Sequence, residues 1–199
     1  MKQAYHHGNL KESLIATALE MVETEGVDRV TLRELTKKLG TSRSAIYRHF
    51  DSKDALLKAV INAGFEKLHA CITPILEQQS VDVVTRFEKM GRAYINFAME
   101  NPAIYRMIFG DALMQEREES CDINDEEQAC GFHALVALLV EGQEKGLFNK
   151  EDPILQATTV WSMIHGLSNL LIDGHVHVKD NFDALFEMGT QTLLKGLQA

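Results

Sequence analysis

The sequence has few cysteines and prolines and lacks any long apolar run. Its three cysteines, Cys71, Cys121 and Cys130, are odd in number and share no C-x-x-C spacing, which argues against a disulfide framework or a zinc knuckle. No apolar run reaches the ~18 residues that a transmembrane helix needs, and residues 1–10 lack the apolar stretch of a secretory signal. We therefore expect a cytoplasmic protein that needs neither a metal nor another cofactor.

The charge of the chain is distributed unevenly. Its 199 residues, 45% apolar and 25% charged, have the composition of a soluble globular protein of one or two domains, with a formal net charge of −9. Residues 1–60 carry ten Lys/Arg and eight Asp/Glu, whereas residues 61–199 carry ten and twenty-one. Residues 29–58 alone hold eight basic and three acidic side chains. This asymmetry indicates a local polyanion-binding surface on an acidic protein.

Apolar residues recur at spacings of three and four along most of the chain, which predicts an all-α protein of about nine helices. Capping residues and Gly or Pro breakers place the helix ends. The expected helices lie at about 10–26, 31–39, 42–49, 52–74 and 83–100, then from 102 onward and at about 127–145, 153–173 and 181–197. Thr31 and Glu34 fit a capping box, Asn101 is expected to cap the helix that Pro102 begins, and Pro74 is expected to kink or end its helix.

Two of the short predicted helices join at Gly40 and have the dimensions of a helix-turn-helix. On the second of them, Ile46 and Phe50 face inward. The opposite side is small, cationic and able to form hydrogen bonds, and it carries Arg43, Ser44, Tyr47 and Arg48. Such a surface suits the major groove of DNA, because arginine can bind guanine and hydroxyl groups can bind bases or phosphates.

Neighbouring cations occupy positions that are unfavourable without an anionic partner. Arg33 and Lys37 are like charges at i, i+4. Lys53 lies in the first turn of a helix, where the helix dipole prefers an anion, and a DNA phosphate would relieve that conflict. The alternative is that these are solvated surface charges, with Asp54 offsetting Lys53.

Several motifs of the first sixty residues form a set that resembles one family. They are Tyr5-His6-His7-Gly8-Asn9-Leu10, Thr31-Leu32-Arg33-Glu34-Leu35, Leu39-Gly40-Thr41-Ser42, Ala45-Ile46-Tyr47-Arg48-His49-Phe50 and Ser52-Lys53. Together they resemble the TetR family of transcriptional regulators. The resemblance implies major-groove contacts from Arg43, Ser44, Ala45, Arg48 and His49, and phosphate contacts from Thr31, Arg33, Tyr47 and Lys53. It also implies a helix-turn-helix DNA-binding domain over residues 1–54 and an effector-binding and dimerisation domain over residues 55–199.

The C-terminal part resembles the Trp-His-Gly subgroup of that family through residues 101–109 and 161–167. Trp161 and His165, an i, i+4 pair, fit a pocket wall with an apolar face and a polar handle. They fit equally well a core histidine that is hydrogen-bonded locally. The candidate effector-binding residues are Tyr94, Phe97, Met107, Phe132, Trp161 and His165, and because no basic cluster accompanies them we expect a largely apolar effector.

The last two predicted helices carry small residues among large apolar ones. These small residues are Ala157, Gly166, Ser168, Ala184, Gly189 and Gly196. Small residues allow helices to approach closely, which fits a four-helix seam between two subunits, and the family resemblance makes this seam the expected dimer interface. A two-fold protein also matches a palindromic operator.

Other chemistry has weaker support. Asp173, His175, His177 and Asp180 have metal-binding side chains but lie along a polar loop, where solvated side chains are the simpler interpretation. Cys121 and Cys130 have mainly acidic neighbours, which discourage a reactive thiolate. No catalytic motif is present. We therefore expect a non-enzymatic, homodimeric DNA-binding regulator, a repressor that a small effector releases from DNA, with activation as the alternative sign of regulation. The alternatives are a helical small-molecule-binding protein and a redox or metal sensor, in both of which the basic N-terminal patch is incidental.

Overall fold

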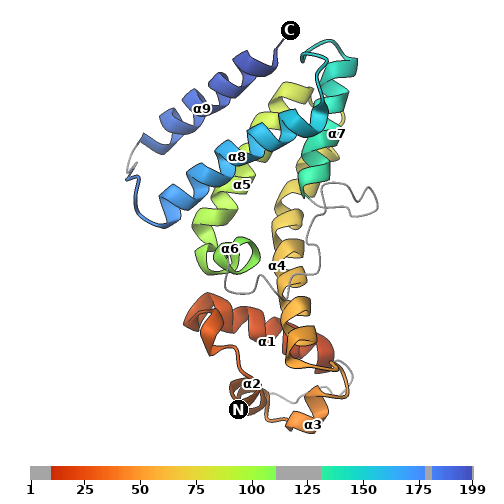
Figure 1. Ribbon diagram of the computed structural model, residues 1–199, viewed down its shortest axis with the longest axis vertical. Coiled ribbons are helices and arrows are strands. Elements are labelled where there is room, and N and C mark those ends of the chain that lie inside the picture. The colour runs from red at the N-terminus through yellow and green to blue at the C-terminus, as the bar shows by residue number, and fades with distance from the viewer. Residues whose placement is uncertain (1–9, 111–130, 178–180, 199) are drawn as a thin grey trace. The chain divides into compact units, whose positions relative to one another are not determined.

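The computed structural model describes residues 10–110, 131–177 and 181–198, and these ranges are all-α (Figure 1). They contain nine α-helices, one 3₁₀ turn and a single β-bridge between Phe148 and Gln198. The elements are α1 Leu10–Glu25, the 3₁₀ turn Val27–Arg29, α2 Leu32–Leu39, α3 Arg43–Ile46, α4 Lys53–Leu76, α5 Val83–Glu100, α6 Pro102–Phe109, α7 Gly131–Glu144, α8 Pro153–Ile172 and α9 Phe182–Leu197. The predicted fold class is confirmed. None of the described helices is both long and apolar enough to cross a membrane.

Local side-chain caps begin several of these helices. The Thr31 hydroxyl accepts a hydrogen bond from the Glu34 amide at 3.2 Å, and the Ser42 hydroxyl accepts one from the Ala45 amide at 3.2 Å. The Asp152 carboxylate likewise accepts from the amide of Ile154 at 2.8 Å. These bonds satisfy amides that have no partner within the helix.

Gly40 ends α2 in the left-handed conformation, with φ of 61°. This conformation costs glycine little because it has no Cβ. The turn to α3 therefore follows directly from the sequence.

Three helix ends differ in detail from the expectation. The regular part of α3 ends at Ile46, before the expected end near His49, and residues 47–50 continue as a turn in which the amides of His49 and Phe50 both bond to the Ile46 carbonyl. Pro74 lies inside α4, which ends two residues later at Leu76. Asn101 makes no side-chain capping bond to α6, because its backbone (φ −129°, ψ 53°) is not the extended conformation of an N-cap residue.

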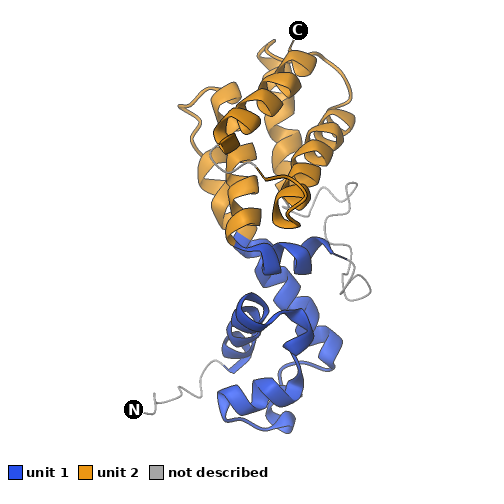
Figure 2. Cartoon of the chain, turned by 90° about the vertical axis from the view of Figure 1, so that its left-hand side faces the viewer, with its two compact units in different colours: residues 1–67, 101–118 blue, residues 68–100, 119–199 orange. Residues whose placement is uncertain are grey.

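The chain divides into two compact units (Figure 2). Unit 1 comprises residues 1–67 and 101–118, and unit 2 comprises residues 68–100 and 119–199. The division falls within α4, and α6 returns the chain to unit 1. The proposed domain boundary between residues 54 and 55 remains a prediction.

Unit 1 is built around α1, which packs against α2, α3 and α6. Leu14 and Met21 on α1 and Leu35 on α2 are fully buried. On α4, a Cβ added at Gly64 would lie 2.6 Å from Cγ2 of Ile108, so only glycine allows α6 to approach this closely. These contacts hold the helix-turn-helix segment on an apolar core.

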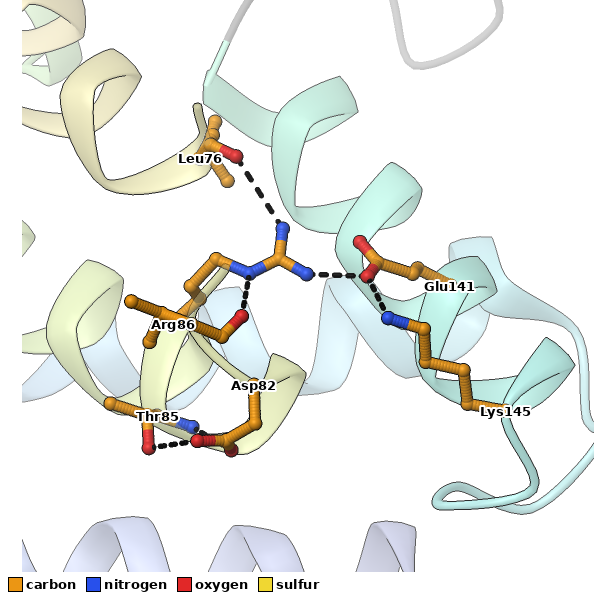
Figure 3. Close-up of polar contacts among 7 residues, drawn as sticks. Leu76, Asp82, Thr85, Arg86, Glu141 and Lys145 are labelled. Carbon is orange, nitrogen blue, oxygen red and sulfur yellow. Dashed lines mark hydrogen bonds and ion pairs between the residues drawn. The ribbon is translucent and has the colours of Figure 1, made fainter. Parts of the chain in front are cut away.

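Unit 2 is formed mainly by α5, α7, α8 and α9, and it buries one arginine (Figure 3). Arg86 is 3% exposed; its guanidinium donates to the carbonyls of Leu76 and Val81 and to a Glu141 carboxylate oxygen at 2.5 Å. Lys145 donates to the same Glu141 oxygen at 2.6 Å. The pKa of Glu141 is lowered by these two cations, first by Lys145 and then by Arg86. Arg86 therefore joins α4, α5 and α7 through one charged group.

Candidate functional site

The outward side of residues 43–49 is the first candidate site. Ile46 and Phe50 are buried in unit 1, as the spacing predicts. The side chains that point outward are exposed, and Ala45 is half-buried between them. The exposed residues are Arg43, Ser44, Tyr47, Arg48 and His49, and Tyr47 is 50% exposed despite its large ring. The buried pair thus anchors a short segment whose other side faces away from the core.

Carboxylates pair with some of the cations of unit 1 but not with those of the predicted interface. Glu25 binds Lys38 at 2.9 Å, which lowers the pKa of the Glu25 carboxyl and raises that of the Lys38 ammonium. The Glu34 carboxylate lies 3.9 Å from the Lys37 ammonium, and this pairing offsets the repulsion between Lys37 and Arg33. Within the described residues no ion pair involves the cations of the predicted interface, which are Arg33, Arg43, Arg48 and Lys53. The proposed offset of Lys53 by Asp54 is therefore not formed as an ion pair in this structure.

The start of α4 offers amide groups beside Lys53. The Ser52 hydroxyl accepts from the Ala55 amide at 3.0 Å, and the first backbone bond of the helix runs from Leu56 to Ser52 at 3.3 Å. The amides of Lys53 and Asp54 precede that bond and have no acceptor within the helix. An exposed ammonium beside such amides suits a phosphate oxygen.

Two hydroxyl groups of the predicted interface already take part in local bonds. The Thr31 oxygen accepts the Glu34 amide, which leaves the hydroxyl hydrogen for another acceptor. Ser44 and Ser42 share a hydrogen bond of 2.8 Å between their hydroxyl oxygens. Both groups are therefore held in place by the caps that begin α2 and α3.

A chain of hydrogen bonds in unit 2 forms the second candidate site. The Trp161 indole Nε1–H donates to the Tyr94 hydroxyl oxygen at 3.1 Å, and that hydroxyl lies 3.2 Å from Nδ1 of His165. That hydroxyl and Nδ1 of His165 share a hydrogen bond whose donor depends on which nitrogen of the neutral histidine ring carries the proton. Burial lowers the pKa of His165, which favours this neutral ring.

The structure brings together some, but not all, of the predicted effector-binding residues. The Phe132 ring lies 5.9 Å from the Trp161 ring, edge to face, and Phe97 is buried on α5 of the same unit. Met107 instead belongs to unit 1, where its Cε would lie 3.0 Å from a Cβ at Gly64. Five of the six residues therefore belong to unit 2, and Met107 belongs to unit 1.

A separate apolar hollow in unit 2 lies between α5, α8 and α9. None of the predicted effector-binding residues lines it. Its lining includes Phe87, Ile164 and Phe186, with Thr190 as its polar member. The hollow and the Trp161–Tyr94–His165 chain are thus different features of unit 2.

Three residues of the alternative metal and redox sites lie outside the described residues: Asp180, Cys121 and Cys130. His175 and His177 are exposed. The part of the chain that the structure describes contains no group of three or more His, Cys, Asp or Glu side chains that would suit a metal ion.

The sequence interpretation missed Arg86 and treated Tyr94 only as an apolar lining residue. The sequence does indicate that Arg86 is buried. It lies three residues after Val83 and four before Met90, on the apolar side of α5. A cation on such a side needs an anionic or carbonyl partner.

Comparisons with known proteins cover most of the chain. Residues 14–60 match the family model described as bacterial regulatory proteins, tetR family. Residues 87–193 match the model described as tetracyclin repressor-like, C-terminal domain. The narrower Trp-His-Gly subgroup stays a prediction.

Individual relatives agree with these models. The nucleoid occlusion factor SlmA of Aliivibrio fischeri strain MJ11 is 34% identical over 111 residues, which is 55% of this chain and 56% of that protein, so the match spans about half of each. A protein of unknown function from Rhodococcus sp. RHA1 has a similar structure, with a TM-score of 0.78 and 25% identity over all of both chains. A variant of TetR from Acinetobacter baumannii AYE, in complex with minocycline, has a TM-score of 0.63 and 20% identity, covering 94% of each chain.

Proposed function

Because the chain belongs to the TetR family of bacterial regulatory proteins, we propose that it is a homodimeric repressor that a small, largely apolar effector releases from a palindromic operator. Each subunit places residues 43–49 in a major groove, with half-sites about one helical turn, ~34 Å, or somewhat more apart. The family assignment already makes it a DNA-binding regulator with a helix-turn-helix. Beyond the family assignment, we propose that the operator is palindromic, that the protein represses, and that a largely apolar effector releases it.

The exposed, unpaired cations of the helix-turn-helix carry this proposal. Arg43, Ser44, Ala45, Arg48 and His49 read base edges, while Thr31, Arg33, Tyr47 and Lys53 bind phosphates. The cations among them have no carboxylate partner in the described residues. A chain of net charge −9 repels DNA overall, so this local surface supplies the attraction.

Salt titration with duplex DNA tests this proposal directly. A duplex is first selected from a random pool with the purified full-length protein, and its dissociation constant is then measured at several salt concentrations. Binding through phosphates requires a log–log slope of about −0.9 for each phosphate contacted. The proposal is wrong if no duplex is preferred in dilute salt, or if the selected sequence lacks two related half-sites.

Two features of unit 2 support an effector site and a dimer. The Trp161–Tyr94–His165 chain is neutral and lies beside Phe132, so it suits an uncharged or aromatic molecule with one polar group. On α8 and α9, Leu155 and Met188 are 68% and 69% exposed, which suits a seam between two copies of the chain. The effector acts by favouring the protein conformation that binds the operator less well, and its effect is limited by that difference in affinity.

The relatives named nucleoid occlusion factors suggest a second candidate function, with the same DNA contacts serving nucleoid occlusion. The similarity covers about half of each protein, so this activity is carried over only as a proposal. Mapping the DNA sites that the protein occupies in cells, together with transcript levels after deletion of its gene, separates the two candidates. A repressor predicts occupied sites beside genes whose transcripts rise on deletion.

A further inference from the structure

Lys11, a cation of α1, lies beside Phe50 in the turn between α3 and α4. The sequence analysis did not predict it as a DNA contact. The Lys11 ammonium is 5.7 Å from the centre of the Phe50 ring. Lys11 is exposed, and within the described residues no carboxylate pairs with it. It shares this property with Arg33, Arg43, Arg48 and Lys53, the cations of the predicted interface. Its position therefore adds a further unpaired charge to the same unit.

Phe50 fixes where this charge lies. Its ring is buried among the core residues of unit 1, and it stands three residues before Lys53. A cation near an aromatic ring within about 6 Å is attracted by the electrons of the ring. Lys11 thus reaches the turn between α3 and α4 from a separate helix, whereas Lys53 reaches it from α4.

The location of Lys11 does not serve the stability of its own helix. It lies in the first turn of α1, where the helix dipole favours an anion such as Glu12. The paired cations of the same unit, Lys37 and Lys38, lie in the last turn of α2, where the dipole favours them. The exposed Lys11 ammonium, held near the Phe50 ring and without a carboxylate partner in the described residues, is therefore available to an external anion.

We propose that Lys11 is an additional phosphate anchor, which binds a DNA phosphate beside the turn between α3 and α4 while Phe50 positions its ammonium. This inference depends on the proposed function, because it requires that residues 43–49 enter the major groove. It adds α1 to the DNA-binding surface. Lys11 carries no base-reading role, since its charge is directed at the backbone of the duplex.

The test compares Lys11→Ala, Lys11→Arg and a matched control with the wild-type protein. Lys67→Ala removes the same charge from the same unit, but Lys67 is paired with Glu23 and lies 14 residues beyond Lys53 on α4, about 21 Å along the helix. Dissociation constants are measured on the selected duplex and on a scrambled duplex between 50 and 200 mM salt. Thermal unfolding of each variant confirms that equal amounts of folded protein are compared.

Because each homodimer carries two copies of Lys11, Lys11→Ala should reduce the salt slope by about 1.8 on both duplexes, so that it loses about 12-fold less affinity than the wild type between 50 and 200 mM. Its preference for the selected duplex should not change, and Lys11→Arg should restore the slope. Lys67→Ala should keep the wild-type slope. If the wild type binds with a steep slope and Lys11→Ala behaves like Lys67→Ala, the inference about Lys11 is wrong and the proposed function stands. If the wild type shows no salt-dependent binding, both are wrong.

Discussion

The Tyr94 hydroxyl accepts a hydrogen bond from the Trp161 indole at 3.1 Å, although 67 residues separate the two in the sequence. Tyr94 lies on α5 and Trp161 on α8, so the bond joins two of the main helices of unit 2. The same hydroxyl lies 3.2 Å from Nδ1 of His165, so it links the two residues of α8 through one side chain of α5. A side chain expected only to line an apolar pocket therefore holds the polar centre of unit 2.

Tyr94→Phe removes the acceptor of the indole hydrogen and the hydrogen-bond partner of His165 Nδ1. Loss of one partner from a buried pair should lower the free energy of unfolding by about 1–3 kcal/mol. Trp161→Phe should also lower the free energy of unfolding. The double variant should lose less than the sum of the two single losses, with a coupling free energy of about 0.5–3 kcal/mol. Urea unfolding of the three variants and the wild type gives this coupling. Strictly additive costs would show that the bond contributes nothing to stability.

Burial lowers the pKa of His165, so the stability of the protein should depend on pH in a defined direction. The unfolded chain has the ordinary histidine pKa of about 6.5 and binds a proton first as the pH falls. The folded state should thus lose stability from about pH 6.5 down to the lowered pKa, by at most about 1.4 kcal/mol per pH unit for one proton. Unfolding measured from pH 8 to 5 should show a shallower fall for His165→Gln. Equal pH profiles would contradict the assignment of a neutral, buried ring.

The helices could be predicted from the sequence because their signals are local. Thr31, Ser42 and Asp152 each cap a helix through an amide two or three residues away. The exposed side of residues 43–49 was likewise predicted, since Ile46 and Phe50 fix which side faces the core. What could be predicted about the site was therefore its exposed surface and the residue types on it.

Contacts between distant segments could not be predicted in this way. Arg86 and Glu141 are 55 residues apart, and no spacing rule pairs them. Met107 was grouped with the effector residues because methionines make adaptable apolar surfaces; its helix α6 belongs to unit 1 and packs at Gly64, and its part in effector binding stays a prediction. Asn101 has a suitable side chain for a cap, and its backbone conformation, set by packing, prevents the bond.

Arg86→Ala should be among the most destabilising substitutions in unit 2. It leaves the partly buried carbonyls of Leu76 and Val81 without their donor, whereas Glu141 is one-third exposed and keeps Lys145, so the loss should be about 1–3 kcal/mol. Arg29→Ala is the control, because the Arg29 side chain is 63% exposed and lies 3.9 Å from the Glu25 carboxylate, and exposed pairs contribute about 0–1 kcal/mol. Chemical unfolding compares the two. Similar losses in both variants would show that the burial of Arg86 is not what makes it important.

Gly64→Ala should destabilise unit 1 even though alanine favours helices. The new Cβ would lie 2.6 Å from Cγ2 of Ile108, so α6 must shift, and overpacking of this kind costs about 1–3 kcal/mol. Asn62→Ala, at an exposed position of the same helix α4, is the control, because it changes helix propensity without adding an atom to the core. That variant should be neutral or gain up to about 1 kcal/mol from helix propensity. Thermal unfolding measures both, and a stabilised Gly64→Ala protein would contradict the close approach of α6.

The division of the DNA interface into base readers and phosphate anchors predicts different effects for Arg43 and Lys53. Arg43→Ala should relax the preference at one position of the selected duplex, costing roughly 1–3 kcal/mol there, because its side chain faces outward from the segment proposed to enter the groove. Lys53→Ala should weaken binding to selected and scrambled duplexes alike and reduce the salt slope by about 1.8, because each of the two subunits loses an ammonium that, beside helix amides, binds a phosphate rather than a base. Dissociation constants for single-position duplex variants, measured at two salt concentrations, separate the two effects. If both substitutions changed affinity by the same factor on every duplex, with equal slopes, the two residues would share one role and the assignment of Arg43 to base reading would be wrong.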